Sequence, residues 1–203
     1  MNTAVALGVL RRIGQPFVTT AEAAAAFGQS PSAASRTLAR LAQAGLIRRI
    51  RHGQWSLEPT PDPFAYASWL TTPLPSYVSL YSALAQHGLI TQVPRVIYVA
   101  SLARTQEITT SIGTFSVHQL QPALFTGFTI ERGVAMATPE KAVFDSLYLA
   151  RARSGRFAGL PEIELPSGFR LDLVAGFGER IEDPGARRRF LRRLRAFRGE
   201  LEP

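Results

Sequence analysis

Apolar residues recur at helical spacing over residues 31–43, and the pattern then changes to that of extended strands. Ser30 is a suitable N-cap and Pro31 suits the first helical position, so the start of this helix is marked twice. The side of the helix predicted to pack inward carries Ala34, Leu38, Leu41 and Gly45. Residues 46–51 follow as a strand, and a turn at residues 52–54 leads to a second strand at residues 55–57. This order predicts a helix followed directly by a β-hairpin.

The residues before this stretch supply two more helices. The first, over residues 3–13, is predicted to turn inward Val5, Val9 and Ile13. Thr19 or Thr20 caps a second, alanine-rich helix that runs through Phe27, and residues 28–30 form a short turn. Residues 1–57 are therefore predicted to form a winged helix-turn-helix domain.

The charge of this region indicates a polyanionic partner. Seven arginines against one acid, Glu22, place +6 of the chain's net charge of +8 within residues 1–57. Double-stranded DNA fits such a surface. Predicted major-groove contacts from the helix are Ser32, Ser35, Arg36, Arg40 and Gln43. Predicted phosphate or minor-groove contacts from the hairpin are Arg48, Arg49 and Arg51. The alternative is a winged helix used only for contact with protein.

Residues 58–63 contain three prolines and predict an extended linker, followed by a second domain at residues 64–203. A helix is predicted from Pro75 to about His87, with Tyr77, Tyr81 and Leu84 on one face. Short β-branched or aromatic runs predict a small, largely antiparallel sheet, at residues 95–100, 107–112, 114–120, 124–131 and 134–137. A further capped helix is predicted from Thr138 to about Arg153, with an apolar face of Val143, Phe144, Leu147 and Ala150, and a stretch rich in glycine and proline follows it. The fold class is α+β.

The last predicted element is a strongly basic helix that begins at Asp183 and Pro184. Its apolar stripe is Ala186, Phe190, Leu194 and Phe197. Arginines cover most of the rest, and a surface for a partner or for phosphate is predicted at Arg188, Arg189, Arg192, Arg193 and Arg195. Three interpretations stay open: a solvated face, a surface for an acidic protein, and extra contact with DNA phosphates.

Composition excludes several chemistries. The chain has no cysteine, so disulfides and thiolate metal sites are absent. The N-terminal sequence is unlike a secretory signal, and no apolar run approaches a membrane span, so a cytoplasmic location is expected. Glu140, Lys141 and Asp145 faintly resemble a metal-dependent nuclease site, but Asp145 can instead pair with Lys141 at i,i+4. We predict no catalytic residues, metal or cofactor, and ordinary roles for His52, His87 and His118.

Three segments resemble one known family. Together with the basic winged helix, PSYVSLYSALAQHGLI (residues 75–90), PRVIYVAS (94–101) and GVAMATPEKAVFDSLY (133–148) are similar to the AbiEi-type antitoxins. The resemblance implies the antitoxin of a two-gene toxin–antitoxin module, which gives the cell abortive infection as a defence against phage. It further implies a winged helix that represses the module by binding inverted repeats in its own promoter. The implied toxin looks like a nucleotidyltransferase and is counteracted by the C-terminal domain without a stable complex.

The expected function is thus that of an antitoxin and transcriptional autorepressor, acting as a monomer or weak dimer that cooperates on DNA, with no membrane partner. One rival is a stand-alone transcription factor whose second domain senses a ligand in a pocket among Tyr77, Tyr81 and Tyr98. The other rival is an enzyme that uses Glu140, Lys141 and Asp145. Its activity would depend on Mg²⁺ and would be lost in Lys141→Ala.

Overall fold

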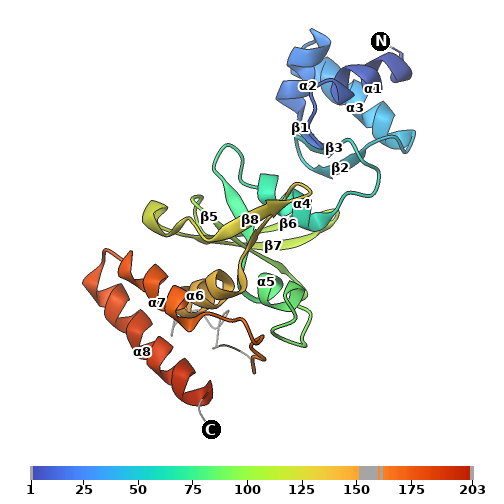
Figure 1. Ribbon diagram of the computed structural model, residues 1–203. Helices are drawn as coiled ribbons and strands as arrows, with labels where there is room; N and C mark the ends of the chain where they lie inside the picture. Colours follow the sequence, from blue (N-terminus) through green and yellow to red (C-terminus); the bar gives the residue numbers. More distant parts are fainter. Residues whose placement is uncertain (1, 151–159, 161, 202–203) are drawn as a thin grey trace. The chain divides into compact units, whose positions relative to one another are not determined.

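The computed structural model describes residues 2–150, 160 and 162–201, and these form two compact units (Figure 1). The N-terminal unit comprises the described residues up to Tyr66 together with Thr109–Gly113. The second unit comprises the other described residues. Each unit has a hydrophobic core and a sheet of its own.

The N-terminal unit is a winged helix-turn-helix. Its elements are α1 (Thr3–Arg11), β1 (Phe17–Thr19), α2 (Thr20–Phe27), α3 (Pro31–Gln43), β2 (Arg48–Arg51) and β3 (Gln54–Ser56). The strands form an antiparallel sheet in the order β1-β3-β2, which leaves β2 on the outside. Its core is formed by Ala6, Leu10, Val18, Ala23, Leu38, Leu41, Ile47 and Trp55. The predicted helices and hairpin are confirmed, and β1 was not predicted.

Two inward positions predicted for this unit are wrong. Val5 is 57% exposed, whereas Ala6 and Leu10 are fully buried, so α1 packs through a neighbouring stripe that uses a smaller residue. Gly45 is exposed and lies beyond the end of α3. With φ at +70°, Gly45 adopts the left-handed conformation that reverses the chain between helix and wing, which explains the glycine better than packing does.

The second unit contains a six-stranded sheet covered by helices (Figure 1). After α4 (Pro63–Trp69), its elements are β4 (Ser76–Val78), α5 (Leu80–Gln86), β5 (Ile97–Ser101), β6 (Gln106–Thr110), β7 (Gly113–Gln119), the 3-10 turn η1 (Pro122–Leu124), β8 (Phe128–Glu131), β9 (Val134–Ala137), α6 (Pro139–Leu149), α7 (Leu171–Glu179) and α8 (Pro184–Leu201). The strand order is β6-β7-β5-β4-β9-β8. The α+β class is confirmed.

The sheet is mixed, so the prediction of a largely antiparallel sheet is wrong. β4 runs antiparallel to β5 and β8 antiparallel to β9, but β4 is parallel to β9 and β5 is parallel to β7. Strand direction depends on which distant segments pair, and β9 inserts beside β4 after a long excursion of the chain. Short apolar runs carry no information about that pairing.

The helix predicted from Pro75 to His87 is also wrong in its first part. Ser76–Val78 is strand β4, paired with β5, and the helix begins only at Leu80. Leu80 has a φ of +50°, so the backbone turns sharply between the two elements. Tyr77, Tyr81 and Leu84 match helical spacing by coincidence, because a three-residue strand is too short to show its own period.

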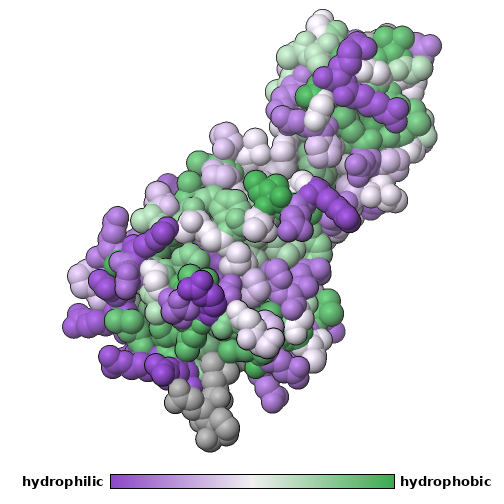
Figure 2. Space-filling view, viewed as in Figure 1, coloured by the Kyte–Doolittle hydropathy of each residue, from purple (hydrophilic) through white to green (hydrophobic). Residues whose placement is uncertain are grey.

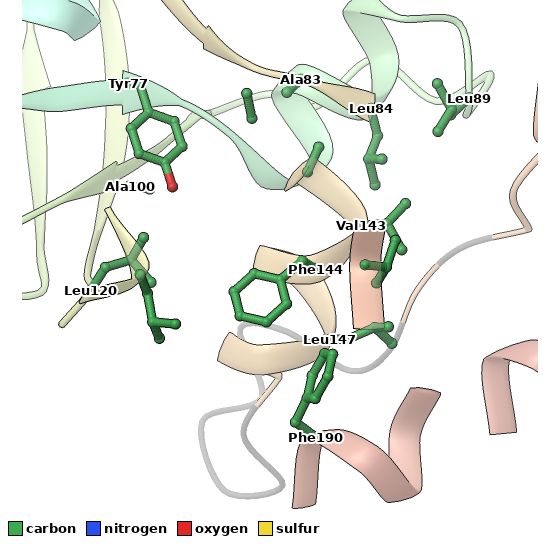
Figure 3. Packing of buried hydrophobic residues seen from close by; sticks show 14 of the residues in the cluster. Tyr77, Ala83, Leu84, Leu89, Ala100, Leu120, Val143, Phe144, Leu147 and Phe190 are labelled. Atoms are coloured by element: carbon green, nitrogen blue, oxygen red, sulfur yellow. The ribbon is translucent and has the colours of Figure 1, made fainter. Parts of the chain in front are cut away.

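Helix α6 lies at the centre of the second unit's core and contacts α5, α7 and α8. Its apolar residues Phe144 and Leu147 face Phe190 of α8, as Figure 3 shows. The predicted stripe of α8 is confirmed, with Phe190 and Phe197 buried. Helix α6 ends at Leu149, before the predicted end at Arg153, which lies outside the described residues. Helix α7, for which no prediction was made, lies in the stretch rich in glycine and proline.

Candidate nucleic-acid interface

Helix α3 is positioned by its own cap and by its buried face. The Ser30 hydroxyl accepts a hydrogen bond from the Ala33 amide at 3.4 Å, and Pro31 is the first helical residue. The residues buried on the opposite side are Ala34, Thr37, Leu38 and Leu41, and the helix packs against α1 and α2. All five residues predicted to contact bases are exposed to solvent: Ser32, Ser35, Arg36, Arg40 and Gln43.

The turn that leads into α3 is set by Gly28 and by the preceding helix. Gly28 has a φ of +61°, the left-handed conformation that ends α2 and redirects the chain within three residues. At the other end of α2, the Thr19 amide donates to the Glu22 carboxylate at 2.6 Å, and the Glu22 amide donates to the Thr19 hydroxyl at 3.1 Å. The only acid among residues 1–57 is thus held in a capping box.

Sequence reasoning missed two polar residues beside these arginines. Gln29 and Thr37 line a pocket of about 500 Å³ together with Ala33, Arg36, Ala39 and Arg40. The Thr37 hydroxyl donates to the Gln29 side-chain oxygen at 3.4 Å and accepts from Arg40 Nη2 at 3.5 Å. Glutamine and arginine carry the groups that pair with adenine and guanine edges, and small alanines leave room for a base. The available signal was the position of Gln29 directly before the cap of α3.

The wing is a short hairpin whose turn contains Gly53 at a φ of +73°. Trp55 anchors it: the ring is 3% exposed, and its Nε1 donates to the Thr20 hydroxyl at 2.9 Å. The Arg49 guanidinium carbon lies 5.6 Å from the centre of the Trp55 ring, and the Arg49 side chain is exposed. Arg49 is therefore the wing arginine best placed to reach a ligand.

The other two wing arginines are half-buried and already have partners within the unit. Arg48 Nη2 donates to the Ser111 carbonyl at 3.0 Å, and Arg51 Nε donates to the Gln54 side-chain oxygen at 2.6 Å. The Tyr66 hydroxyl donates to that same oxygen. Burial raises the pKa of Tyr66 to about 12, an effect that nearby Arg51 partly offsets. Arg48 and Arg51 thus support the shape of the wing as well as its charge.

The trio predicted for an enzymatic alternative forms a closed cluster in the second unit. Lys141 Nζ lies 2.5 Å from Asp145 Oδ1, the predicted i,i+4 pair, and both side chains are fully buried. Burial lowers the pKa of Lys141, although Asp145 opposes the effect. Rings of Tyr77, Phe144 and Phe177 lie within 5.9 Å of the ammonium group. The pair has no contact with solvent, so a substrate could not reach either side chain in this structure.

Two hydroxyl groups complete this cluster. Asp145 Oδ2 accepts hydrogen bonds from Tyr77 at 2.9 Å and Ser79 at 2.7 Å. Burial, reinforced by the adjacent carboxylate, raises the pKa of Tyr77 far above its ordinary value. Glu140 is not part of the cluster; its carboxylate accepts from the Arg170 amide at 3.2 Å.

The tyrosines proposed to line a ligand pocket are divided between two places. Tyr77 stacks on Phe128 at 4.7 Å in the core, whereas Tyr81 packs edge-on against Tyr98 at 5.6 Å. As for metals, the described residues contain no group of three histidine or acidic side chains placed to hold an ion.

The basic face of α8 lies on the surface of the second unit, and Figure 2 shows hydrophilic side chains over this helix. Four of its predicted partner residues are exposed: Arg188, Arg189, Arg192 and Arg195. Arg193 is half-buried and donates to the carbonyls of Leu147 at 2.9 Å and Tyr148 at 3.5 Å. It therefore caps the C-terminal end of α6, where a cation is favourable.

Comparison with models of protein families finds a match for the N-terminal unit. Residues 2–54 match the model of the MarR family, over all three helices and the wing as far as the first residue of β3. The N-terminal unit is therefore a MarR-type winged helix, a DNA-binding domain of transcription regulators. A search of the curated proteins finds no match. Within the described residues, no helix is long and apolar enough to cross a membrane.

Proposed function

We propose that this chain represses its own promoter by binding inverted repeats through α3 and the wing, and that it is the antitoxin of a two-gene module. One observation carries the DNA-binding part: α3 presents two arginines, two serines and a glutamine to solvent in a region of net charge +6. Arg36 and Arg40 are suited to guanine, while Arg49 reaches along phosphate from the wing.

The antitoxin part is supported by the resemblance of three segments to AbiEi-type antitoxins. Residues 75–90 contain β4 and α5, residues 94–101 contain β5, and residues 133–148 contain β9 and most of α6. β4 pairs with both β5 and β9, and α5 packs on α6. The segments that carry the resemblance are therefore neighbours in the second unit, as expected if they define a common domain.

The first experiment measures binding of the whole chain to a duplex that covers the region upstream of its own gene. We expect retardation in a gel at nanomolar to micromolar protein, protected half-sites spaced by about one helical turn, and loss of binding in the double variant Arg36→Ala, Arg40→Ala. The matched control replaces Arg104, an exposed arginine of the second unit. Equal binding of an unrelated duplex by the parent protein would contradict operator recognition.

The second experiment concerns the neighbouring reading frame. Cloned alone, it should stop growth, and this chain supplied from an unrelated promoter should restore growth. The double arginine variant should still restore growth, because neutralisation is assigned to the second unit and repression to the first. If the parent chain restored growth and the double arginine variant did not, neutralisation would depend on DNA binding.

A stand-alone, ligand-responsive regulator is the second candidate, since a winged-helix match over residues 2–54 is equally compatible with it. It predicts a harmless neighbouring reading frame and a DNA affinity that changes with a small molecule. In either case we propose a monomer or weak dimer that cooperates on DNA, so a duplex with both half-sites should fill over a narrower range of protein concentration than a duplex with one half-site.

A further inference from the structure

One residue from the second half of the sequence contacts the wing with all its polar groups. The Ser111 amide donates to the Ile50 carbonyl at 3.0 Å, and the Ser111 hydroxyl donates to the Arg49 carbonyl at 2.8 Å. The Ser111 carbonyl accepts from Arg48 Nη2 at 3.0 Å. Residues 109–113, which contain Ser111, belong to the N-terminal unit. Three consecutive residues of β2 are thus held by a single serine.

Strand β2 gains from this support because β3 pairs with it on one side only. It has four residues, lies on the outside of a three-stranded sheet, and its register against β3 shifts between Arg49 and Arg51. A shift of this kind interrupts the ladder of backbone hydrogen bonds. The carbonyls of Arg49 and Ile50 find their donors in Ser111.

The turn that carries Ser111 is braced by its own hydrogen bonds. The Thr110 hydroxyl donates to the Gly113 carbonyl at 2.8 Å and accepts from the Ile112 amide at 3.2 Å. Ser111 is therefore presented from a fixed turn, and its hydroxyl is directed to the wing by a backbone that is already ordered.

We infer that Ser111 is a positioning residue of the nucleic-acid interface, an inference that rests on the proposed DNA binding. By fixing the backbone of Arg49 it sets where that exposed guanidinium meets phosphate. Arg48 strengthens the same contact from the side of β2, since its guanidinium donates to the Ser111 carbonyl. The DNA-reading surface is thus completed by residues some sixty positions downstream of the wing, as the sequence separation of 62 between Arg49 and Ser111 indicates.

The binding test is a cycle of variants on the upstream duplex. Ser111→Ala should weaken binding about twofold to tenfold, the equivalent of one hydrogen bond. In an Arg49→Ala background the same change should have an effect of under about twofold, since the two residues act through one contact. Ser111→Thr, which keeps a hydroxyl, should bind nearly as the parent does.

The matched control is Thr105→Ala. The Thr105 hydroxyl accepts from the Gln119 amide at 3.0 Å, so this change also removes one side-chain hydrogen bond to backbone, but in the second unit. It should leave binding unchanged. Equal effects of Ser111→Ala with and without Arg49, or an equal effect of Thr105→Ala, would overturn the inference by assigning the loss to general destabilisation.

Amide exchange separates failure of this inference from failure of the proposed function. In the free whole chain, the Ser111 amide should exchange slowly because it donates to Ile50. Fast exchange overturns the contact itself, whatever the DNA results. Slow exchange in a protein that binds no duplex overturns the proposed function, and with it the role of Ser111 on DNA, while leaving the contact in place.

Discussion

Lys141 and Asp145 form an ion pair one turn apart on α6, with 2.5 Å between Nζ and Oδ1 and neither side chain exposed. A buried pair is costly to break because the remaining charge has no water around it. We expect Asp145→Leu to lower the free energy of unfolding by about 3–5 kcal/mol. Lys141→Met should cost less, since two hydroxyls still donate to the carboxylate. Urea denaturation measures both.

The double variant Lys141→Met, Asp145→Leu provides the control for this prediction. It buries no unpaired charge, although Tyr77 and Ser79 lose their acceptor, so its cost should fall below the sum of the single costs by about 1–3 kcal/mol. Additive costs would mean that the two side chains do not form a pair in solution.

Two glycines of α7 should respond in opposite ways to alanine. A Cβ on Gly178 would lie 2.3 Å from Phe190 Cε1, and Phe190 is fully buried. Gly178→Ala should therefore destabilise the second unit by about 1–3 kcal/mol. Gly176 has no atom within 4 Å of its Cβ position, so Gly176→Ala should stabilise the helix by about 0.5–1 kcal/mol. Equal effects in thermal unfolding would contradict the packing of α7 on α8.

Tyr66 should make the N-terminal unit sensitive to alkali. An unfolded tyrosine ionises near pH 10, whereas burial holds the pKa of Tyr66 at about 12. Its stabilising contribution is complete below pH 10 and is lost as pH rises through about 12, by roughly 1–2 kcal/mol once solvent screening is allowed for. The difference in unfolding free energy between Trp69→Phe and Trp69→Phe, Tyr66→Phe, followed by Trp55 fluorescence, should shrink over this interval. A constant difference would contradict the raised pKa.

Arginines of helix and wing should differ in what they contribute to binding. If α3 reads base edges as proposed, Arg36→Ala should cost about 1–3 kcal/mol and relax the preference for one base pair. Arg49→Ala should weaken specific and random duplexes alike. Competition between the two duplexes in a gel measures both effects, and reversed patterns would exchange the roles of helix and wing.

Salt should weaken binding in proportion to the phosphates neutralised. With about four phosphate contacts per subunit, the logarithm of the binding constant should fall with the logarithm of salt concentration at a slope near −3.6. Arg49→Ala should make the slope shallower by about one. A slope near zero would exclude the arginine surface as the source of affinity.

Local signals allowed the most accurate predictions from sequence. The helix starts at Thr19, Ser30 and Thr138 are all present, since a cap depends on residues two or three positions away. The solvent-exposed side of α3 also followed from helical spacing. The neighbouring Gln29 and Thr37 did not, because their hydrogen bond joins a turn to a buried helix position.

Non-local pairing explains what the sequence did not reveal. β4 was predicted as helix because its identity as a strand depends on β5 and β9 rather than on its own three residues. The contact of Ser111 with the wing had no local signal at all. Similarly, the half-buried position of Arg193 is decided by where α6 ends, which an arginine-rich pattern cannot indicate.

The three hydrogen bonds between Ser111 and β2 have a practical consequence for work with fragments of this protein. A fragment that ends at Tyr66 would lack residues 109–113, so the outer strand of its small sheet would keep unsatisfied carbonyls. Such bare edges attract other chains and promote aggregation by intermolecular strand addition. A soluble fragment with only the N-terminal unit would therefore need residues 109–113 to be added back, for instance through a short linker after α4.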